Sequence, residues 1–383
     1  MTKRKRRVFV STAFIFALQV TYVSASELAT QDPYIEGFKA YAEEVKSYSN
    51  DLNHSLLSYV DEVKKAEKQV GYIGKALPIP KATKVTDGVY TVVGSMIWHN
   101  PSNFGLNNNL SFIIFEDGVF VFNAGANAAL AYSLHQQIKA LTDKPVKWVA
   151  VENNQGHAYL GASYWVDVGV KNLYSSQAAN DQFDAGFERT KREWSERVGK
   201  NITLSARNVS DQFTTFEDKM VIEVGGGQGE LSLLKRGYSG VEKVYLYDFG
   251  PGHTPASTSL YIPSRKVFFT GDLGFNERMP VFFKYTNVKA WIESYEAMMS
   301  TIPEDTIMVP GHGTPTNMAT LKKQTYDYLV YLYQNIEKIV EADGSLEDAL
   351  SLDQSMYQDR PVFRQAAENN ARHVYNEISG GGF

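Results

Sequence analysis

The chain has no cysteine among its 383 residues. This absence excludes disulfide bonds, a thiolate nucleophile and any metal site built from cysteine. A metal ion in this protein must therefore be held by histidine, aspartate or glutamate side chains. Clusters of basic residues are also absent outside the first few positions, and the formal net charge is −5, so nucleic acid is not an expected partner.

Long apolar stretches are scarce, and the one candidate lies at the N-terminus. Lys3–Arg7 form a basic head, Val8–Val23 are mostly apolar, and Val23-Ser24-Ala25 has the small-residue pattern of a cleavage site. The apolar stretch is shorter than the roughly 20 residues of a membrane-spanning helix and contains polar residues, which favours a signal peptide over a membrane anchor. We therefore expect cleavage after Ala25, a periplasmic or secreted protein, and no stable membrane span in the mature chain.

The pattern of residues changes three times along the chain. Residues 1–25 form the predicted signal peptide, and residues 26–84 are predicted to be helical before a linker, because apolar and tyrosine residues recur every three or four positions. Residues 85–316 alternate short β runs with helical stretches, and residues 317–383 return to a helical pattern. The apolar helix faces at the two ends either cover the chain's own central domain or form a homo-oligomer.

The central region repeats one order of elements. Strands and then a helix occur first between residues 85 and 141, and a further buried strand and helix lead to a second β-rich half from Asn208 to Phe269. Such a repeat predicts an α+β protein with two sheets sandwiched between helices.

Histidine and aspartate residues stand near the ends of predicted strands. His157 and His253 each follow a strand, and Asp272 and His312 each end one, always beside glycine or proline. Loops that gather at one edge of a sheet are where folds of this kind build polar sites. The sequence therefore predicts that these four side chains meet.

The same segments resemble the metallo-β-lactamase superfamily. Three of them match the family's metal loops in order and in local sequence: Gly250–Thr254, Phe269–Asp272 and Pro310–Gly313. A fourth, Phe120–Gly125, matches the family's Asp-Thr/Ala-Gly turn, with Asn123 where aspartate is usual. The resemblance covers roughly residues 85–316 and implies a four-layer αββα metallo-β-lactamase-like sandwich with N- and C-terminal helical additions.

The helical tail carries a narrower resemblance. Ser355-Met356-Tyr357 and Val374–Ile378 are similar to the tails of a periplasmic branch of this superfamily that is linked to sulfur oxidation and quinoprotein relay.

The chain departs from the family in its His-x-His-x-Asp-His motif. At the corresponding positions it has Asn153, Gln155, His157 and Ala158. Both histidines that help to form the family's first metal position are thus replaced by amides, and amide oxygens are weak zinc ligands. The resemblance implies an incomplete metal site.

The ligands that the resemblance leaves favour one ion. The first position keeps His253 and the shared Asp272, whereas the second keeps His157, Asp272 and His312. Two histidines and one carboxylate with open coordination positions suit Zn²⁺, with Fe²⁺ as the second candidate.

The leading hypothesis is a divergent periplasmic metal-dependent hydrolase that acts on an unknown small-molecule substrate. One ion would activate water, with Asp272 and His253 as catalytic residues. Asn153 and Gln155 would orient the substrate. His99 is either a further residue at the opening of this site or a surface histidine.

The alternative is a catalytically inactive metallo-β-lactamase-fold protein that acts as a small-molecule or partner-binding module. His253 and His312 would then only make hydrogen bonds within rigid glycine-rich loops, and Asp272 would cap a turn. The missing ligands favour this alternative, whereas the retained loops favour the enzyme.

Overall fold

The computed structural model describes residues 76–77, 79–100, 103–198, 206–225 and 240–381. The predicted signal peptide and most of the predicted helical segment 26–84 lie outside these residues, so both stay predictions. Among the helices that the structure describes, none is both long enough and apolar enough to cross a membrane.

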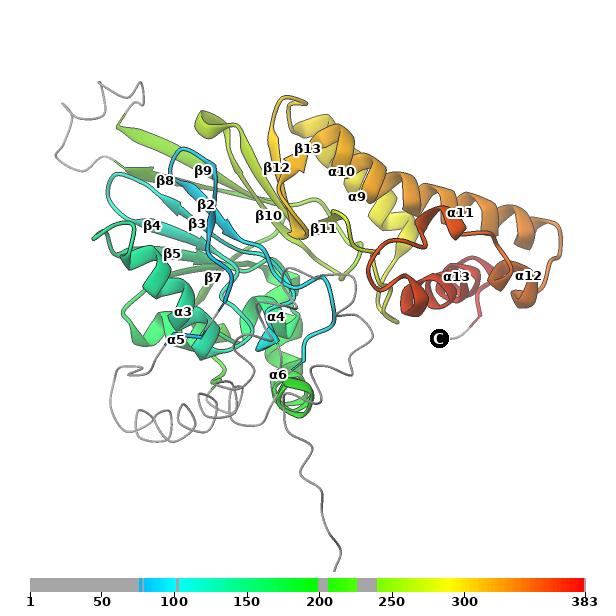
Figure 1. Cartoon of the computed structure of the whole chain (residues 1–383), viewed down its shortest axis with the longest axis horizontal. Helices are drawn as coiled ribbons and strands as arrows, with labels where there is room; N and C mark the ends of the chain where they lie inside the picture. The colour runs from blue at the N-terminus through cyan, green and yellow to red at the C-terminus, as the bar shows by residue number, and fades with distance from the viewer. Residues whose placement is uncertain (1–75, 78, 101–102, 199–205, 226–239, 382–383) are drawn as a thin grey trace, which may run out of the picture.

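The strands of the described residues form two sheets (Figure 1). The first has the order β1 (Thr83–Thr86), β2 (Val89–Val92), β3 (Leu110–Ile114), β4 (Val119–Phe122), β5 (Val146–Ala150), β6 (Asn172–Ser176) and β7 (Phe213–Phe216). The second has the order β13 (Thr316–Asn317), β12 (Ile307–His312), β11 (Val267–Phe275), β10 (Thr258–Ile262), β9 (Val241–Asp248) and β8 (Lys219–Gly225). Pairing is parallel from β4 to β7 and between β11 and β12, and antiparallel elsewhere.

Helices cover both outer faces of this pair of sheets. The α-helices of the described residues are α3 (Ala128–Lys139), α4 (Gly156–Tyr159), α5 (Ala162–Asp167), α6 (Gln177–Val198), α9 (Val288–Thr301), α10 (Met318–Gln324), α11 (Tyr326–Glu341), α12 (Leu346–Leu350) and α13 (Phe363–Ser379). Single 3₁₀ turns occur at Ser210–Gln212, Pro263–Arg265 and Ser355–Tyr357. Figure 1 shows α3 and α5 on one side of the sheets and α9 to α11 on the other.

Alternation along the strands produces the layers, because successive side chains point to opposite faces of a sheet. In β4, Val119 and Val121 belong to the core under α3, α5 and α6, whereas Phe120 and Phe122 belong to the core between the two sheets. In β11, Phe269 faces the core between the sheets and Phe268 faces the core under α9 and α11. These three cores confirm the predicted αββα sandwich.

Local sequence fixes several helix starts. Asn127, Asn287 and Asn317 each precede a helix and accept a hydrogen bond from a backbone N–H of its first turn. Such caps contribute about 1 kcal/mol each. A capping box between Ser345 and Asp348 begins α12.

The helical tail packs on its own domain. Its apolar residues, including Tyr328, Leu332 and Val374, share one core with Phe268 and Trp291. The predicted apolar face of the tail is therefore buried within the chain. Association of two copies through the helical ends stays a prediction.

Candidate metal centre

The four predicted side chains reach one point from four chain segments. His157 lies in α4 after β5, His253 lies between β9 and β10, and His312 is the last residue of β12. Asp272 lies within β11 rather than at its end, which corrects the sequence-based placement. All four are at most 4% exposed, although charged and imidazole side chains rarely lie so deep without partners.

A local irregularity of β11 aims Asp272 into this site. The pairing of β11 with β12 shifts register on both sides of Gly271, which has φ +55°. A Cβ atom at Gly271 would lie 2.5 Å from Glu152 Oε2, so only glycine fits here. Irregular strand positions of this kind redirect a side chain.

Asp272 is the centre of the cluster. Its Oδ1 lies 3.2 Å from His312 Nε2, and its Oδ2 lies 3.4 Å from His157 Nε2 and 3.5 Å from His253 Nε2. The structure thus brings together all four residues that the sequence proposed as ligands.

The residues of the second position fit one ion by geometry. Ligand atoms of His157, Asp272 and His312 all lie within 4.8 Å of one another. Asp272 presents Oδ1 to His312 at 3.2 Å and Oδ2 to His157 at 3.4 Å, and these separations are close to the roughly 3.3 Å expected between ligand atoms of a tetrahedral zinc with metal–ligand distances of about 2.0–2.1 Å. The 4.8 Å bound is wider than this spacing, so the three groups would draw closer together around an ion. His157 Nε2 and Asp272 Oδ1 are buried and make no well-aligned hydrogen bond, although each lies 3.2–3.4 Å from another group of the cluster. A ligand would satisfy such atoms.

The first position is closed by the two amides. Asn153 donates from Nδ2 to Asp272 Oδ2 over 3.0 Å, and the Gln155 amide donates to His253 Nε2 over 3.1 Å. The same Gln155 amide also donates to the Tyr285 hydroxyl over 3.2 Å. The lone pairs that a first ion would use are therefore occupied by amide hydrogens.

Electrostatics divides the histidines into two kinds. Burial by itself lowers the pKa of His157, but the negative charge of Asp272 and the contact with Glu152 outweigh it and raise the pKa to about 9. Burial, reinforced by the positive charges of His157 and Arg278, lowers the pKa of His253 to about 4 and of His312 to about 3. Near pH 7 the metal-free protein thus holds a charged His157 beside neutral His253 and His312.

Asp272 stays ionised in these surroundings. Burial by itself raises the pKa of this carboxyl, but the neighbouring imidazoles of His312 and His157 hold it well below its usual range. A buried carboxylate of this kind is a suitable anionic metal ligand.

Arg278 is a feature that the sequence analysis missed, and it opposes ligation by His312. Its Nη1 donates to His312 Nδ1 over 2.8 Å, and the residue is 2% exposed. Because a guanidinium only donates, His312 Nδ1 accepts and the hydrogen of the neutral ring sits on Nε2. Metal-bound histidines usually donate from their second nitrogen instead. An ion can bind His312 Nε2 only if this hydrogen bond is broken.

Glu152 is a second missed residue. It is fully buried, its Oε1 accepts from Asn108 over 3.1 Å and from Asn123 over 3.0 Å, and Oε1 lies 3.3 Å from His157 Nε2. Burial and the charge of Asp272 raise the pKa of Glu152. Asn123, in the position where the resemblance expects aspartate, thus binds a neighbouring carboxyl group. A glutamate directly after the apolar run 146–151 was the available signal.

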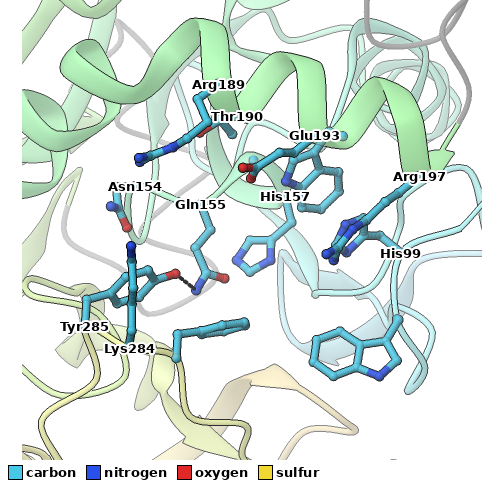
Figure 2. A pocket seen from close by; sticks show the side chains of 14 residues that line it. His99, Asn154, Gln155, His157, Arg189, Thr190, Glu193, Arg197, Lys284 and Tyr285 are labelled. Atoms are coloured by element: carbon cyan, nitrogen blue, oxygen red, sulfur yellow. Dashed lines mark hydrogen bonds between the residues drawn. The ribbon is translucent and has the colours of Figure 1, made fainter. Parts of the chain in front are cut away.

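A cavity of about 310 Å³ opens beside the metal centre (Figure 2). Its wall includes two of the predicted substrate residues, Gln155 and His99, and also His157. His99 stacks on Trp194 with ring centres 3.9 Å apart, so it belongs to the pocket wall. Asn153 does not line the cavity but lies behind Gln155, whose backbone N–H donates to Asn153 Oδ1.

A family model and several solved structures are similar to parts of this chain. The family model of the metallo-beta-lactamase superfamily matches residues 231–312, which include His253, Asp272 and His312. Similar solved structures include a metallo-beta-lactamase from Pontibacter korlensis, with 17% identity over 65% of this chain and 98% of that one and a TM-score of 0.49. TMB-1 has 19% identity over 65% and 96% of the two chains with a TM-score of 0.44. DIM-1 metallo-beta-lactamase exposed to ceftazidime has 17% identity over 66% and 97%, with a TM-score of 0.45.

Proposed function

We propose that this chain, a divergent member of the metallo-β-lactamase fold, is a hydrolase that uses one divalent ion at His157, Asp272 and His312. The observation that carries the proposal is the convergence of three buried ligand atoms, two of them without a well-aligned hydrogen bond. Zn²⁺ is the favoured ion and Fe²⁺ the second candidate, since both accept two histidines and one carboxylate. A bound ion of this kind lowers the pKa of water and polarises a carbonyl or phosphoryl oxygen.

The chain's own residues shape the space in which a substrate would react. Gln155 lines the cavity and is held by His253 and Tyr285. Partial burial raises the pKa of Tyr285 to about 12, so its hydroxyl keeps its proton near pH 7 and is available as a donor to a developing negative charge. His253, with its lowered pKa, is a weak base, and we assign it a positioning role toward Gln155 rather than proton transfer.

Export is part of the same proposal. The basic head, the apolar stretch and the Val23-Ser24-Ala25 site support a periplasmic or secreted protein. The narrower placement in the sulfur-oxidation and quinoprotein-relay branch stays a prediction.

Metal analysis tests the function directly. We expect about one zinc or iron per purified chain, and hydrolysis of a panel of esters, thioesters and lactams that chelation abolishes. Asp272→Asn should lose the metal and the activity, because Asp272 is the anionic member of the proposed ligand set and contacts both histidines. Retention of metal by this variant would contradict the site.

A binding module without catalysis is the second candidate. It is favoured by the two amides that close the first position and by Arg278, which donates to His312 Nδ1. A folded chain that takes up neither zinc nor iron on loading, and that hydrolyses nothing in the panel, would establish this candidate instead.

A further inference from the structure

The cavity beside the metal centre has an excess of positive charge at its rim. Arg189 and Arg197 reach it from α6, and Lys284 reaches it from the segment between β11 and α9 (Figure 2). Glu193 is the carboxylate among the lining residues. Three cations against one anion contrast with the chain as a whole, whose formal net charge is −5.

These three cations have no partner within the described part of the chain. Among the residues that the structure describes, none makes an ion pair or a hydrogen bond with the side chains of Arg189, Arg197 or Lys284. Other arginines, such as Arg265 and Arg372, are paired with carboxylates. Glu193 lies one helical turn from each of the two arginines of α6, where an i,i+4 pair is expected, yet it pairs with neither. The rim cations are therefore available to a ligand.

Apart from His157, the inner wall of the cavity is largely aromatic. Trp98, Trp194 and Phe283 line it. Burial and the positive charge of Arg197 lower the pKa of His99 to about 3, so this ring is neutral and stacks flat on Trp194. Trp194 comes this close because position 156 is glycine, where a Cβ atom would lie 2.4 Å from the Trp194 Nε1. The wall suits an apolar or aromatic body.

We propose that the cavity binds a small organic anion, with its apolar body against Trp98, Trp194 and Phe283 and its negative group at the rim cations. The volume of about 310 Å³ is at the lower end for ligand pockets, which favours a compact molecule. Because His157 belongs both to the cavity wall and to the metal centre, a bound anion lies next to the reacting site. That the bound anion is a substrate rests on the proposed hydrolase, whereas binding of the anion does not require the metal.

Matched probes of one shape test the charge requirement. Binding of benzoate, benzenesulfonate and phenyl phosphate to the full mature chain is measured by calorimetry and by tryptophan fluorescence, with benzamide as the neutral counterpart. We expect at least one of the three anions to bind roughly tenfold more tightly than benzamide, since a charged partner strengthens a hydrogen bond by this order. The best of the three identifies the charged group. Equal binding of benzamide, or no binding of any anion, would overturn the proposal.

Variants on α6 locate the charge. Arg189→Gln combined with Arg197→Gln should weaken binding of the best anion roughly tenfold and leave the affinity for benzamide unchanged. Arg192→Gln is the matched control, because Arg192 lies on the same helix, is exposed and does not line the cavity. Glu193→Gln should have the opposite effect and strengthen binding of the anion roughly twofold to fivefold, because it removes a negative charge that repels the anion. An effect of Arg192→Gln as large as that of the double variant would mean that only general surface charge acts.

Asp272→Asn separates the two proposals. If the metal-free variant still binds the anion and the double arginine variant does not, the anion site stands whatever the fate of the hydrolase. If the parent chain binds metal and hydrolyses neutral esters but has no preference for anions, this inference fails and the proposed hydrolase stands.

Discussion

Replacement of Arg278 by methionine tests the metal centre most sharply, because the structure predicts a gain. Arg278 Nη1 donates to His312 Nδ1 over 2.8 Å, which keeps a hydrogen on the Nε2 atom that faces Asp272. An ion that binds this Nε2 must first break a hydrogen bond from a charged donor, which costs about 1.5–3 kcal/mol. Without Arg278, His312 Nδ1 is free to carry the hydrogen.

The expected magnitude follows from that cost. With about 1.4 kcal/mol for each factor of ten, Arg278→Met should bind zinc roughly 10- to 100-fold more tightly than the parent chain. Loss of a positive charge close to the cation acts in the same direction. The affinity is measured by competition with a chromophoric chelator at pH 7, after removal of metal with EDTA.

A control protects this result against misfolding. Arg278 is buried, with its guanidinium carbon 5.4 Å from the Trp98 ring centre, and methionine preserves much of the aliphatic packing. The melting temperature and tryptophan fluorescence of the metal-free variant show whether the fold is kept. If a folded Arg278→Met binds zinc no more tightly than the parent, His312 Nε2 is not a ligand and the three-residue site is wrong.

Three further predictions concern the absent position, pH and export. Asn153→His combined with Gln155→His should add one metal ion per chain, because the parent amides lie 3.0 Å from Asp272 Oδ2 and 3.1 Å from His253 Nε2. Alanine at both positions should add no ion. Unchanged metal content in a folded double-histidine variant would contradict the assignment of these two positions. His157, with a pKa raised from 6.5 to about 9, stabilises the metal-free fold fully below pH 6.5 and loses this contribution as the pH rises through 9, so about 3 kcal/mol of stability should disappear over that range. Thermal melts of the EDTA-treated chain measure this loss, which should be absent in Asp272→Asn. Mass spectrometry of the exported protein should find Ser26 as its first residue, and a full-length product retained in the membrane would refute the signal peptide.

Much of the centre was predictable because its chemistry is written in short local segments. Gly-x-Gly-His-Thr, Thr-Gly-Asp and Gly-His-Gly each combine a flexible backbone with one ligand, and strand order places them at one edge. The alignment of residues 153–161 with the family's motif also placed both amides correctly, since Asn153 contacts Asp272 and Gln155 contacts His253.

The missed residues lack such local signals. Tyr285 lies 130 residues from the Gln155 whose amide donates to it, and Arg278 lies 34 residues from His312. An arginine in a loop and arginines on an exposed helix face are ordinary surface residues in a sequence, and only packing shows that one is buried and others surround a cavity.

The sequence by itself determined the layered fold and the four metal-type loops, since alternation and glycine-rich turns act over a few residues. The tertiary structure alone decided the protonation of the site. It brought Asn153 into hydrogen-bonding contact with Asp272, 119 residues away, and placed the Glu152 carboxyl group beside His157 Nε2. It also directed Arg278 at His312. Proton and ion affinities depend on charges within a few ångströms in a buried environment, and those distances exist only after segments far apart in the chain have packed together.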